Sequence, residues 1–352
     1  MNTIMIASTT AYSGKSGICL AMLKELADAG HDVAYFKPFG TMPVMIDDVQ
    51  TDEDAVYLRE QATVKASLAD VCPVVRSRRL LEDVLSGRAE NLGDVVSESF
   101  ERVSAAADTV VVEGPSDIDQ GRTAGLSLCD LAGRLDAKVL LVHKPVAEDL
   151  PDEILFVADC LGDRLAGIVF NAVRESVQDF YAGPVTDFLE NAGVRVFGVI
   201  DHDPLLSSAS VHEIVDALSG TVLCADEKLD AAVETFMVGA MGQDKALRFF
   251  RRKNHKAVIT GGDRADVQLA ALETDTRCII LTGNLPPSSL VLSRAEELGV
   301  PMVLVGMDTL SAVEKMEALL GRIRLHDPVK ADRIRAMFAA AVNTDEVLAS
   351  LR

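Results

Sequence analysis

Short, strongly apolar segments alternate with amphipathic helical segments along most of the chain. The apolar segments are rich in β-branched residues and end at turn residues. Such segments are typical of strands buried on both faces of a parallel sheet, in which helices make the crossovers. We therefore predict an α/β fold with a mostly parallel sheet. In the first part of the chain, the predicted strands are residues 3–8, 32–38, 109–114, 138–145, 165–173 and 194–200, and the helices include 17–30, 127–137 and 152–163.

The pattern breaks between Asp203 and Ser210, where Pro204 and three serines interrupt it. A smaller α/β series follows, with predicted strands at 255–262, 277–284 and 301–308 and helices at 210–220, 264–274, 290–299 and 309–321. Two domains suit a chain of 352 residues. We place the first domain at residues 1–205, the second at 206–325, and C-terminal helices at 326–352.

The charge and composition of the chain exclude some classes of binding partner. The formal net charge of −20 argues against nucleic acid or an anionic membrane as the main partner. The first residues have the pattern of a strand rather than a signal peptide, and no run of about 18 apolar residues occurs, so we expect a cytoplasmic protein without a membrane span. The cysteines lack C-x-x-C spacing, and we expect them to be small buried apolar residues in a reducing compartment. They are Cys19, Cys72, Cys129, Cys160, Cys224 and Cys278.

The first predicted strand leads into a Gly-Lys-Ser turn that opens a helix. Gly14, Lys15 and Ser16 complete the end of the pattern G-x-x-x-x-G-K-[ST], whereas Thr9 stands at the place of the first glycine. In this context, backbone N–H groups and the helix dipole favour a bound phosphate. Lys15 is expected to reach the β- and γ-phosphates, and the Ser16 hydroxyl to contact Mg²⁺. The predicted nucleotide-binding residues of this loop are Tyr12, Ser13, Gly14, Lys15, Ser16 and Gly17.

Polar side chains also end three other predicted strands. Lys37, Glu113 and Asn171 lie at carboxyl ends of strands, which meet at the edge where parallel sheets bind ligands. For Lys37, the alternative is an exposed lysine at a strand end. For Asn171, the alternative is an amide that caps the next turn.

Acidic residues begin the helix predicted in "TDEDAVYLRE". Asp52 and Glu53 are best explained as negative charges at the positive end of the helix dipole. Asp54 has the same explanation available, but a metal-binding role is favoured for it. Because Mg²⁺ needs only one or two carboxylates besides phosphate and water oxygens, Ser16, Asp54 and Glu113 would suffice.

On these motifs, the first domain resembles dethiobiotin synthetase and its P-loop relatives. It is most similar to the N-terminal part of long phosphotransacetylases, where a form such as "STTAYSGKS" is familiar. The resemblance implies ATP and Mg²⁺ as cofactors, Lys15 and Lys37 as catalytic residues, and Asn171 as the contact to adenine. It also implies a magnesium shell of Ser16, Asp54 and Glu113.

The segment after Glu113 departs from this family. The family has "VEGAGG", whereas this chain has "VEGPSD", so Pro115, Ser116 and Asp117 replace the Ala-Gly-Gly segment. In the synthetase, that segment lies against the organic substrate. We therefore do not expect diaminopelargonic acid as a substrate or biotin synthesis as a role.

The second domain resembles the DRTGG domain over roughly residues 204–321. The residues that carry this likeness are Gly262, Asp263, Arg264, Thr282 and Gly283, with Asn284 in place of a second glycine. The resemblance implies a regulatory domain that often dimerises. Either these loops form a structural or dimer contact, or Arg264 clamps an anionic effector.

In long phosphotransacetylases, the acetyltransferase domain follows the DRTGG domain. Here the sequence stops at "VNTDEVLASLR", roughly where that domain would begin, so acetyl transfer is not expected from this chain alone. We therefore expect a regulatory, ATP- and Mg²⁺-binding protein that forms a homodimer through the DRTGG domain and acts on a separate acetyl-transfer enzyme.

Two alternatives remain open. One is an ATP-dependent, ligase-like enzyme that phosphorylates a small carboxylate or carbamate, with Lys15, Lys37 and Mg²⁺ neutralising charge. The other is a scaffold with a relic loop, against which the intact lysine, hydroxyl and carboxylates argue. The six histidines are scattered, and none is predicted to act as a general base.

Overall fold

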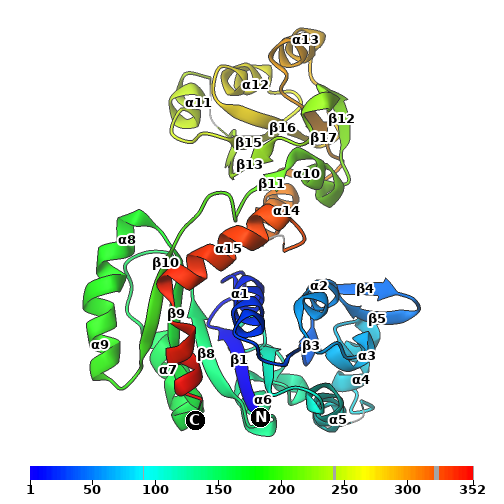
Figure 1. The fold of residues 1–352 in the computed structure, drawn as a ribbon. Coiled ribbons are helices and arrows are strands. Elements are labelled where there is room, and N and C mark those ends of the chain that lie inside the picture. The colour runs from blue at the N-terminus through cyan, green and yellow to red at the C-terminus, as the bar shows by residue number, and fades with distance from the viewer. Residues whose placement is uncertain (90, 241–242, 321–324, 352) are drawn as a thin grey trace. The chain divides into compact units, whose positions relative to one another are not determined.

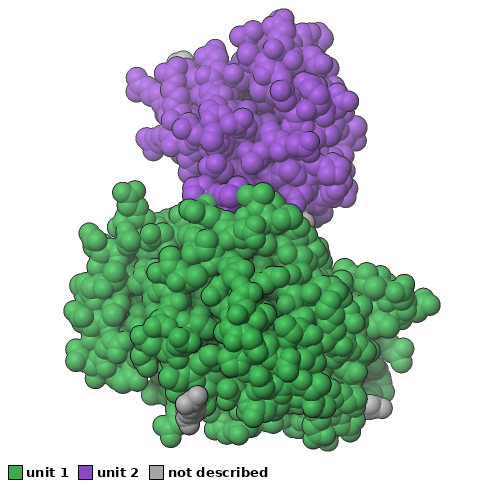
Figure 2. All heavy atoms as spheres, viewed as in Figure 1, with its two compact units in different colours: residues 1–203, 324–352 green, residues 204–323 purple. Residues whose placement is uncertain are grey.

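The computed structural model describes residues 1–89, 91–240, 243–320 and 325–351. The chain forms two compact units, residues 1–203 with 324–352 and residues 204–323 (Figures 1 and 2). Both units have helices packed on a mostly parallel sheet, which confirms the α/β class predicted from the sequence. None of the described helices combines the length and apolarity that crossing a bilayer requires.

The first unit is built on a six-stranded sheet in the order β10-β9-β8-β1-β7-β2. All five neighbouring pairs are parallel. The strands are β1 (Asn2–Ser8), β2 (Val33–Phe36), β7 (Thr109–Glu113), β8 (Lys138–His143), β9 (Leu165–Val173) and β10 (Val196–Asp201). Each lies within or close to a strand expected from the sequence, because long β-branched runs leave few other structures open to them.

Helices cover both faces of this sheet. Met5 and Ala7 of β1 join the core that also contains residues of α5 (Leu92–Ser104), α6 (Leu128–Arg134) and α7 (Asp152–Leu161). Ile4 and Ile6, which point to the opposite face, are fully buried as well. The helix α1 (Lys15–Asp28) contacts β1, β7 and β2. A strand buried on both faces is what the near-continuous apolar runs indicated.

A small lobe that the sequence analysis did not predict, apart from its acidic helix, lies between β2 and β7. It contains β3 (Phe39–Gly40), β4 (Pro43–Ile46), β5 (Val49–Asp52), α2 (Glu53–Gln61), α3 (Leu68–Val71), β6 (Val74–Val75) and α4 (Arg78–Leu85). β4 and β5 form an antiparallel hairpin across Asp47 and Asp48, whose φ angles are +46° and +65°. Two such residues are typical of a tight hairpin turn. The hairpin places Asp52, the last residue of β5, beside Pro43 and directly before the start of α2.

The last two helices, α15 (Pro328–Ala341) and α16 (Thr344–Ala349), complete the first unit. α15 packs against α1 (Figure 1). Arg335 Nε donates to Glu25 Oε1 at 3.0 Å. The end of α15 also approaches β10 so closely that a Cβ on Gly198 would lie 2.2 Å from the Ala341 carbonyl oxygen. The second unit is therefore an insertion between β10 and α15. The remaining helices of the first unit are α8 (Glu175–Phe180) and α9 (Thr186–Asn191), joined by a π-helical turn over Tyr181–Val185.

The second unit has a five-stranded sheet in the order β12-β17-β16-β15-β14, in which only β12 is antiparallel to its neighbour. Its strands are β12 (Thr221–Cys224), β14 (Thr235–Val238), β15 (Lys256–Gly261), β16 (Thr276–Thr282) and β17 (Met302–Leu304), and β11 (Ala209–Ser210) pairs with β13 (Ala232–Val233). One face carries α10 (Val211–Leu218) and α14 (Thr309–Leu320). The other carries α11 (Gln243–Phe250), α12 (Ala265–Leu272) and α13 (Ser289–Leu298).

The expectation of six separate cysteines is wrong for one pair. Cys129 on α6 and Cys160 on α7 form a disulfide bond, with their Cα atoms 6.5 Å apart. These residues are 31 positions apart in the chain, and the packing of the two helices brings them together. Cys19, Cys72 and Cys278 are buried free thiols, as expected, and Cys224 is half-buried.

The close approach at Gly198 generates a stability prediction. Gly198→Ala forces β10 and the end of α15 apart, and we expect a loss of about 1–3 kcal/mol in the free energy of unfolding, measured by urea denaturation. The matched control is Gly133→Ala on α6, where a Cβ meets no atom within 4 Å. That variant is expected to be neutral or more stable by about 0.5–1 kcal/mol. Equal unfolding midpoints for the two variants would contradict the prediction.

Candidate nucleotide-binding site

The loop between β1 and α1 has the backbone geometry of an anion-binding site. Tyr12 and Gly14 both adopt left-handed conformations, with φ of +60° and +86°. A bulky residue such as Tyr12 adopts this conformation only where the surrounding structure imposes it. The loop then turns into α1 at Lys15, and no side chain of the described residues caps the helix start at Gly14. The first N–H groups of α1 and its positive dipole end therefore face the loop.

Lys15, the first residue of α1, is buried. Its Nζ donates to Ser8 Oγ at 3.0 Å and to the Ser116 carbonyl oxygen at 3.2 Å. Burial lowers the pKa of Lys15, against an opposing effect of Glu113. Ser116 belongs to the Pro-Ser-Asp segment that departs from the synthetase pattern. This segment therefore lies directly against the lysine that is expected to hold phosphate.

Ser16 lies between two carboxylates. Its hydroxyl is 2.9 Å from Asp54 Oδ2 and 3.0 Å from Glu113 Oε1. Glu113 is held from its other side by the hydroxyl of Tyr35, which donates to Oε2 at 2.7 Å. Burial, followed by the charge of Glu113, raises the pKa of Tyr35 well above its usual range. Tyr35 therefore remains a hydrogen-bond donor and orients Glu113.

Lys37 extends from the end of β2 into the same group of acids. Its Nζ is 2.8 Å from Asp52 Oδ1, 3.6 Å from Asp54 Oδ2 and 3.2 Å from Glu113 Oε1. Burial alone lowers the pKa of Lys37, but these three carboxylates raise it well above its usual range. Burial also raises the pKa of Asp54 to about 6, although Lys37 opposes this effect. Lys37 is thus a buried cation and not the exposed strand-end lysine of the alternative explanation.

Only one of the two structural roles of Asp52 was predicted from the sequence. As expected, it caps α2, and its Oδ1 accepts from the Asp54 backbone N–H at 3.0 Å. It is also fully buried, binds Lys37, and accepts from the backbone N–H groups of Thr41 and Met42 at 2.8 and 2.9 Å. The β4–β5 hairpin creates these contacts, and nothing in the sequence pattern indicated that hairpin.

The oxygen atoms at this site are of the kind that bind the expected Mg²⁺. One hydroxyl and two carboxylates, from Ser16, Asp54 and Glu113, form an all-oxygen set of the kind that Mg²⁺ uses together with phosphate and water oxygens. Among the described residues, no group of three or more His, Cys, Asp or Glu side chains is arranged to hold a metal ion alone. Ser16, Asp54 and Glu113 supply fewer oxygens than Mg²⁺ coordinates, and water or ligand oxygens would complete its shell.

His143 contacts the loop between β1 and α1, and the sequence analysis did not predict this contact. It ends β8, and its Nδ1 lies 2.9 Å from Oγ1 of Thr9, the residue in the place of the first glycine. Its position was the available signal, because it follows an apolar strand as Lys37 and Glu113 do. Asn171 supports the same loop from β9, where its Nδ2 donates to the Ser13 carbonyl oxygen at 2.8 Å. The amide therefore fixes the loop, and its contact to adenine stays a proposal.

In the second unit, the loops after β15 and β16 pack tightly together. A Cβ on Gly262 would lie 1.6 Å from the Leu285 carbonyl oxygen, so only glycine allows this approach. Asn284 has a φ of +54°, a conformation that asparagine tolerates, which explains why it can replace the second glycine of the pattern. Arg264 Nε is 3.3 Å from Asp266 Oδ1, and Asp263 lies next to it in the same turn.

Together, the parallel sheet and the lysine-bearing loop define a P-loop protein with a second α/β unit. Residues 2–210 match the AAA domain family and residues 213–319 match the DRTGG domain family. The chain belongs to the AAA domain family and carries a DRTGG domain after the P-loop domain.

Whole-chain relatives are phosphate acetyltransferases. That of Pseudomonas aeruginosa is 26% identical over 97% of this chain and 51% of its own length. That of Synechocystis is 22% identical over 100% of this chain and 52% of its own length. The chain thus spans about half the length of these curated relatives. Over 56% of the chain, it is also 28% identical to 43% of the cobyric acid synthase of Syntrophobacter fumaroxidans.

Among solved structures, the MinD cell division protein of Aquifex aeolicus is 17% identical, covering 58% of this chain and 84% of its own, with a TM-score of 0.37. The CBS and DRTGG domains of Clostridium perfringens pyrophosphatase are 18% identical, covering 43% of this chain and 73% of theirs, with a TM-score of 0.30.

The environment of His143 predicts a specific acid sensitivity. Burial lowers its pKa from 6.5 to about 4, although Asp149 opposes the shift. Below pH 6.5, the unfolded chain binds a proton at this position that the folded chain does not bind until about pH 4, so stability is lost as the pH falls through this window. His143→Gln should reduce the drop in melting temperature between pH 7 and pH 5.

The control for this effect is His212→Gln, because the His212 side chain is 64% exposed. This variant should keep the pH dependence of the unaltered chain. An identical pH dependence for His143→Gln and the unaltered chain would contradict the prediction.

Proposed function

We propose that the first unit binds ATP with Mg²⁺ and that the chain uses this binding in regulation rather than in acetyl transfer. The observation that carries the proposal is the convergence of Lys15, Ser16, Asp54 and Glu113 at the carboxyl edge of one parallel sheet. A buried lysine at a helix start, with a hydroxyl and two carboxylates beside it, provides complementary groups for the phosphates and for their metal ion.

Within this proposal, Lys15 contacts the β- and γ-phosphates, and the loop residues Tyr12, Ser13, Gly14 and Gly17 surround them. Ser16, Asp54 and Glu113 hold Mg²⁺, and the Asn171 amide lies near the adenine. Lys37 neutralises the carboxylates and lies ready to contact a transferring phosphoryl group. The second unit forms a homodimer contact or binds an effector through Gly262, Asp263, Arg264, Thr282 and Gly283.

The regulated partner in this proposal is an acetyl-transfer enzyme on a separate chain. The similarity to about half the length of phosphate acetyltransferases supports it, because the matched half contains the P-loop and DRTGG domains.

A ligase-like activity is the second candidate, and the position of Lys37 favours it. A second buried lysine beside Asp54 and Glu113 could stabilise charge on a phosphoryl group as it moves to a carboxylate. The Ser116 carbonyl oxygen, which accepts from Lys15, narrows the space for a second substrate. ADP release from ATP that depends on an added small carboxylic acid distinguishes this activity from binding alone.

Replacement of Lys15 tests the nucleotide site. Lys15→Ala removes the cation that faces the phosphates, and we expect the Mg²⁺-dependent part of ATP binding to weaken at least 100-fold in calorimetry. The control is Lys24→Ala, near the other end of the same helix, which should bind as the unaltered chain does. Unchanged Mg²⁺-dependent ATP binding by Lys15→Ala would refute the proposed role of this loop in nucleotide binding.

The DRTGG loops are tested separately. Asp263→Ala and Arg264→Ala should weaken self-association in sedimentation velocity, or effector binding, and leave ATP affinity unchanged because these residues belong to the other unit. Arg294→Ala is the control, since Arg294 forms only an exposed pair with Glu297 on α13 among the described residues. If both loop variants associate and bind ligands as the control does, these loops have no such role.

A further inference from the structure

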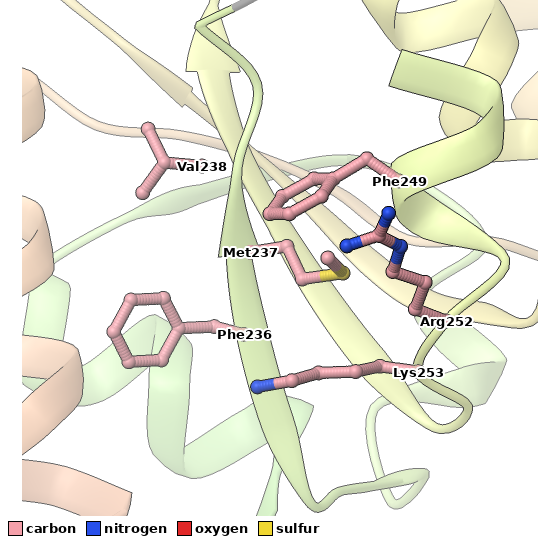
Figure 3. Close-up of a pocket in the computed structure, with 6 residues that line it drawn as sticks. All are labelled: Phe236, Met237, Val238, Phe249, Arg252 and Lys253. Carbon is pink, nitrogen blue, oxygen red and sulfur yellow. The ribbon is translucent and has the colours of Figure 1, made fainter. Parts of the chain in front are cut away.

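A cavity of about 460 Å³ lies beside β14 in the second unit, and Asp263 and Arg264 are not among the residues that line it. Its volume is in the range of pockets that hold small organic ligands. Figure 3 shows Met237 of β14, Phe249 of α11, and the following Arg252 and Lys253 on the same side of the strand, whereas Phe236 and Val238 point away. Side chains from one strand and one helix end therefore form the wall.

The apolar part of this wall suits a flat ring. Phe249 is half-buried, so part of its ring remains accessible, and the thioether of Met237 lies beside it on the same side of β14, almost fully buried (Figure 3). Aromatic and thioether groups both make favourable contacts with aromatic rings. β14 is also an edge strand that pairs only with β15 among the described strands. Its free edge offers backbone groups that can hydrogen-bond to the polar edge of a heteroaromatic ring.

The charged part of the wall suits an anion. Residues 245–253, "KALRFFRRK", contain five basic residues and no acidic one, in a chain of net charge −20. Within the described part of the chain, no carboxylate lies within ion-pair distance of Arg252 or Lys253. Lys253 Nζ instead donates to Thr235 Oγ1 of β14 at 3.1 Å, and the Arg252 guanidinium lies 5.9 Å from the Phe249 ring centre.

Cations after a helix often serve only to stabilise its negative end. Here, backbone N–H groups already bond to carbonyl oxygens at the end of α11. The N–H groups of Arg251 and Arg252 donate to the carbonyl oxygens of Leu247 and Phe249 at 3.2 and 3.1 Å. Among the described residues, no hydrogen bond joins the side chains of Arg252 and Lys253 to these carbonyl oxygens, and both side chains are exposed at the cavity.

We propose that this cavity is a binding site for a nucleotide-like ligand, that is, a heteroaromatic ring that carries phosphate. The ring packs on the accessible part of Phe249, beside Met237, and the phosphate contacts Arg252 and Lys253. This inference rests on the proposed regulatory role of the second unit, and it gives that unit an effector site separate from the DRTGG loops.

The test is calorimetry on the full chain with ADP, adenosine and tripolyphosphate as probes. Lys15→Ala removes the expected phosphate site of the first unit, and this variant should still bind one ADP per chain. Adding Arg252→Ala and Lys253→Ala should weaken that binding at least tenfold, and adding Phe249→Ala should do the same. Adenosine and tripolyphosphate should each bind at least tenfold more weakly than ADP.

The control is Lys15→Ala combined with Lys245→Ala and Arg248→Ala, which removes two exposed cations of α11 that do not line the cavity. It should bind ADP unchanged. Because Arg252 and Lys253 are exposed, their replacement should leave the melting temperature unchanged, so loss of binding is not loss of folding.

The outcomes separate this inference from the P-loop proposal. Loss of all ADP binding in Lys15→Ala, with binding intact in the unaltered chain, overturns the inference and leaves the P-loop proposal standing. One ADP per chain both with and without Lys15, lost in the Arg252 and Lys253 variant, supports the inference and counts against the P-loop proposal. Equal binding of tripolyphosphate and ADP overturns the aromatic half of the inference.

Discussion

The pairing of the buried Lys37 with three carboxylates is the interaction on which the first unit's candidate site depends. Its ammonium group lies within 4 Å of the carboxylates of Asp52, Asp54 and Glu113, which come from three different elements. Carboxylates removed from water are stable only when they are compensated by charge and hydrogen bonds. The end of β2, the end of β7 and the start of α2 are therefore held together as one electrostatic unit. The acids of the candidate site are therefore in position before any ligand binds.

The phosphate loop is supported in the same way, by polar residues at strand ends. Thr9 contacts His143 of β8, and Ser13 accepts from Asn171 of β9, so two neighbouring strands hold the loop that β1 begins. A loop supported from several rigid strands keeps its N–H groups oriented before a ligand arrives. This explains how the loop keeps its shape with Thr9 where many P-loops have glycine. The departure of greater chemical consequence is the Pro-Ser-Asp segment, because its Ser116 carbonyl oxygen contacts Lys15.

The sequence predicted features that depend on local pattern and on sheet geometry. The six strands of the first sheet could be predicted, and so could the approach of Lys15, Glu113 and Lys37, because carboxyl ends of parallel strands share one edge. The contacts of Asp52 with Lys37, Thr41 and Met42 could not be predicted, because they depend on the β4–β5 hairpin. The side chains of β4 are mostly exposed, so its sequence has no alternating apolar pattern that would indicate a strand. The edge strands β12 and β14 were not predicted either, because each has only four residues and is half-exposed. The Cys129–Cys160 pair depends on how two helices pack, which spacing along the chain does not reveal.

The insertion of the second unit has a consequence for synthesis of the protein. The first sheet is complete once β10 has been made, but the surfaces of α1 and β10 that α15 covers stay open until the entire second unit has followed. At ~5–20 residues per second, that interval lasts on the order of ten seconds. During this time, the salt-bridge partners of Arg335 on α1 and the groove at Gly198 face solvent. The length of the inserted unit thus sets how long the first unit waits for α15 to pack against α1 and β10.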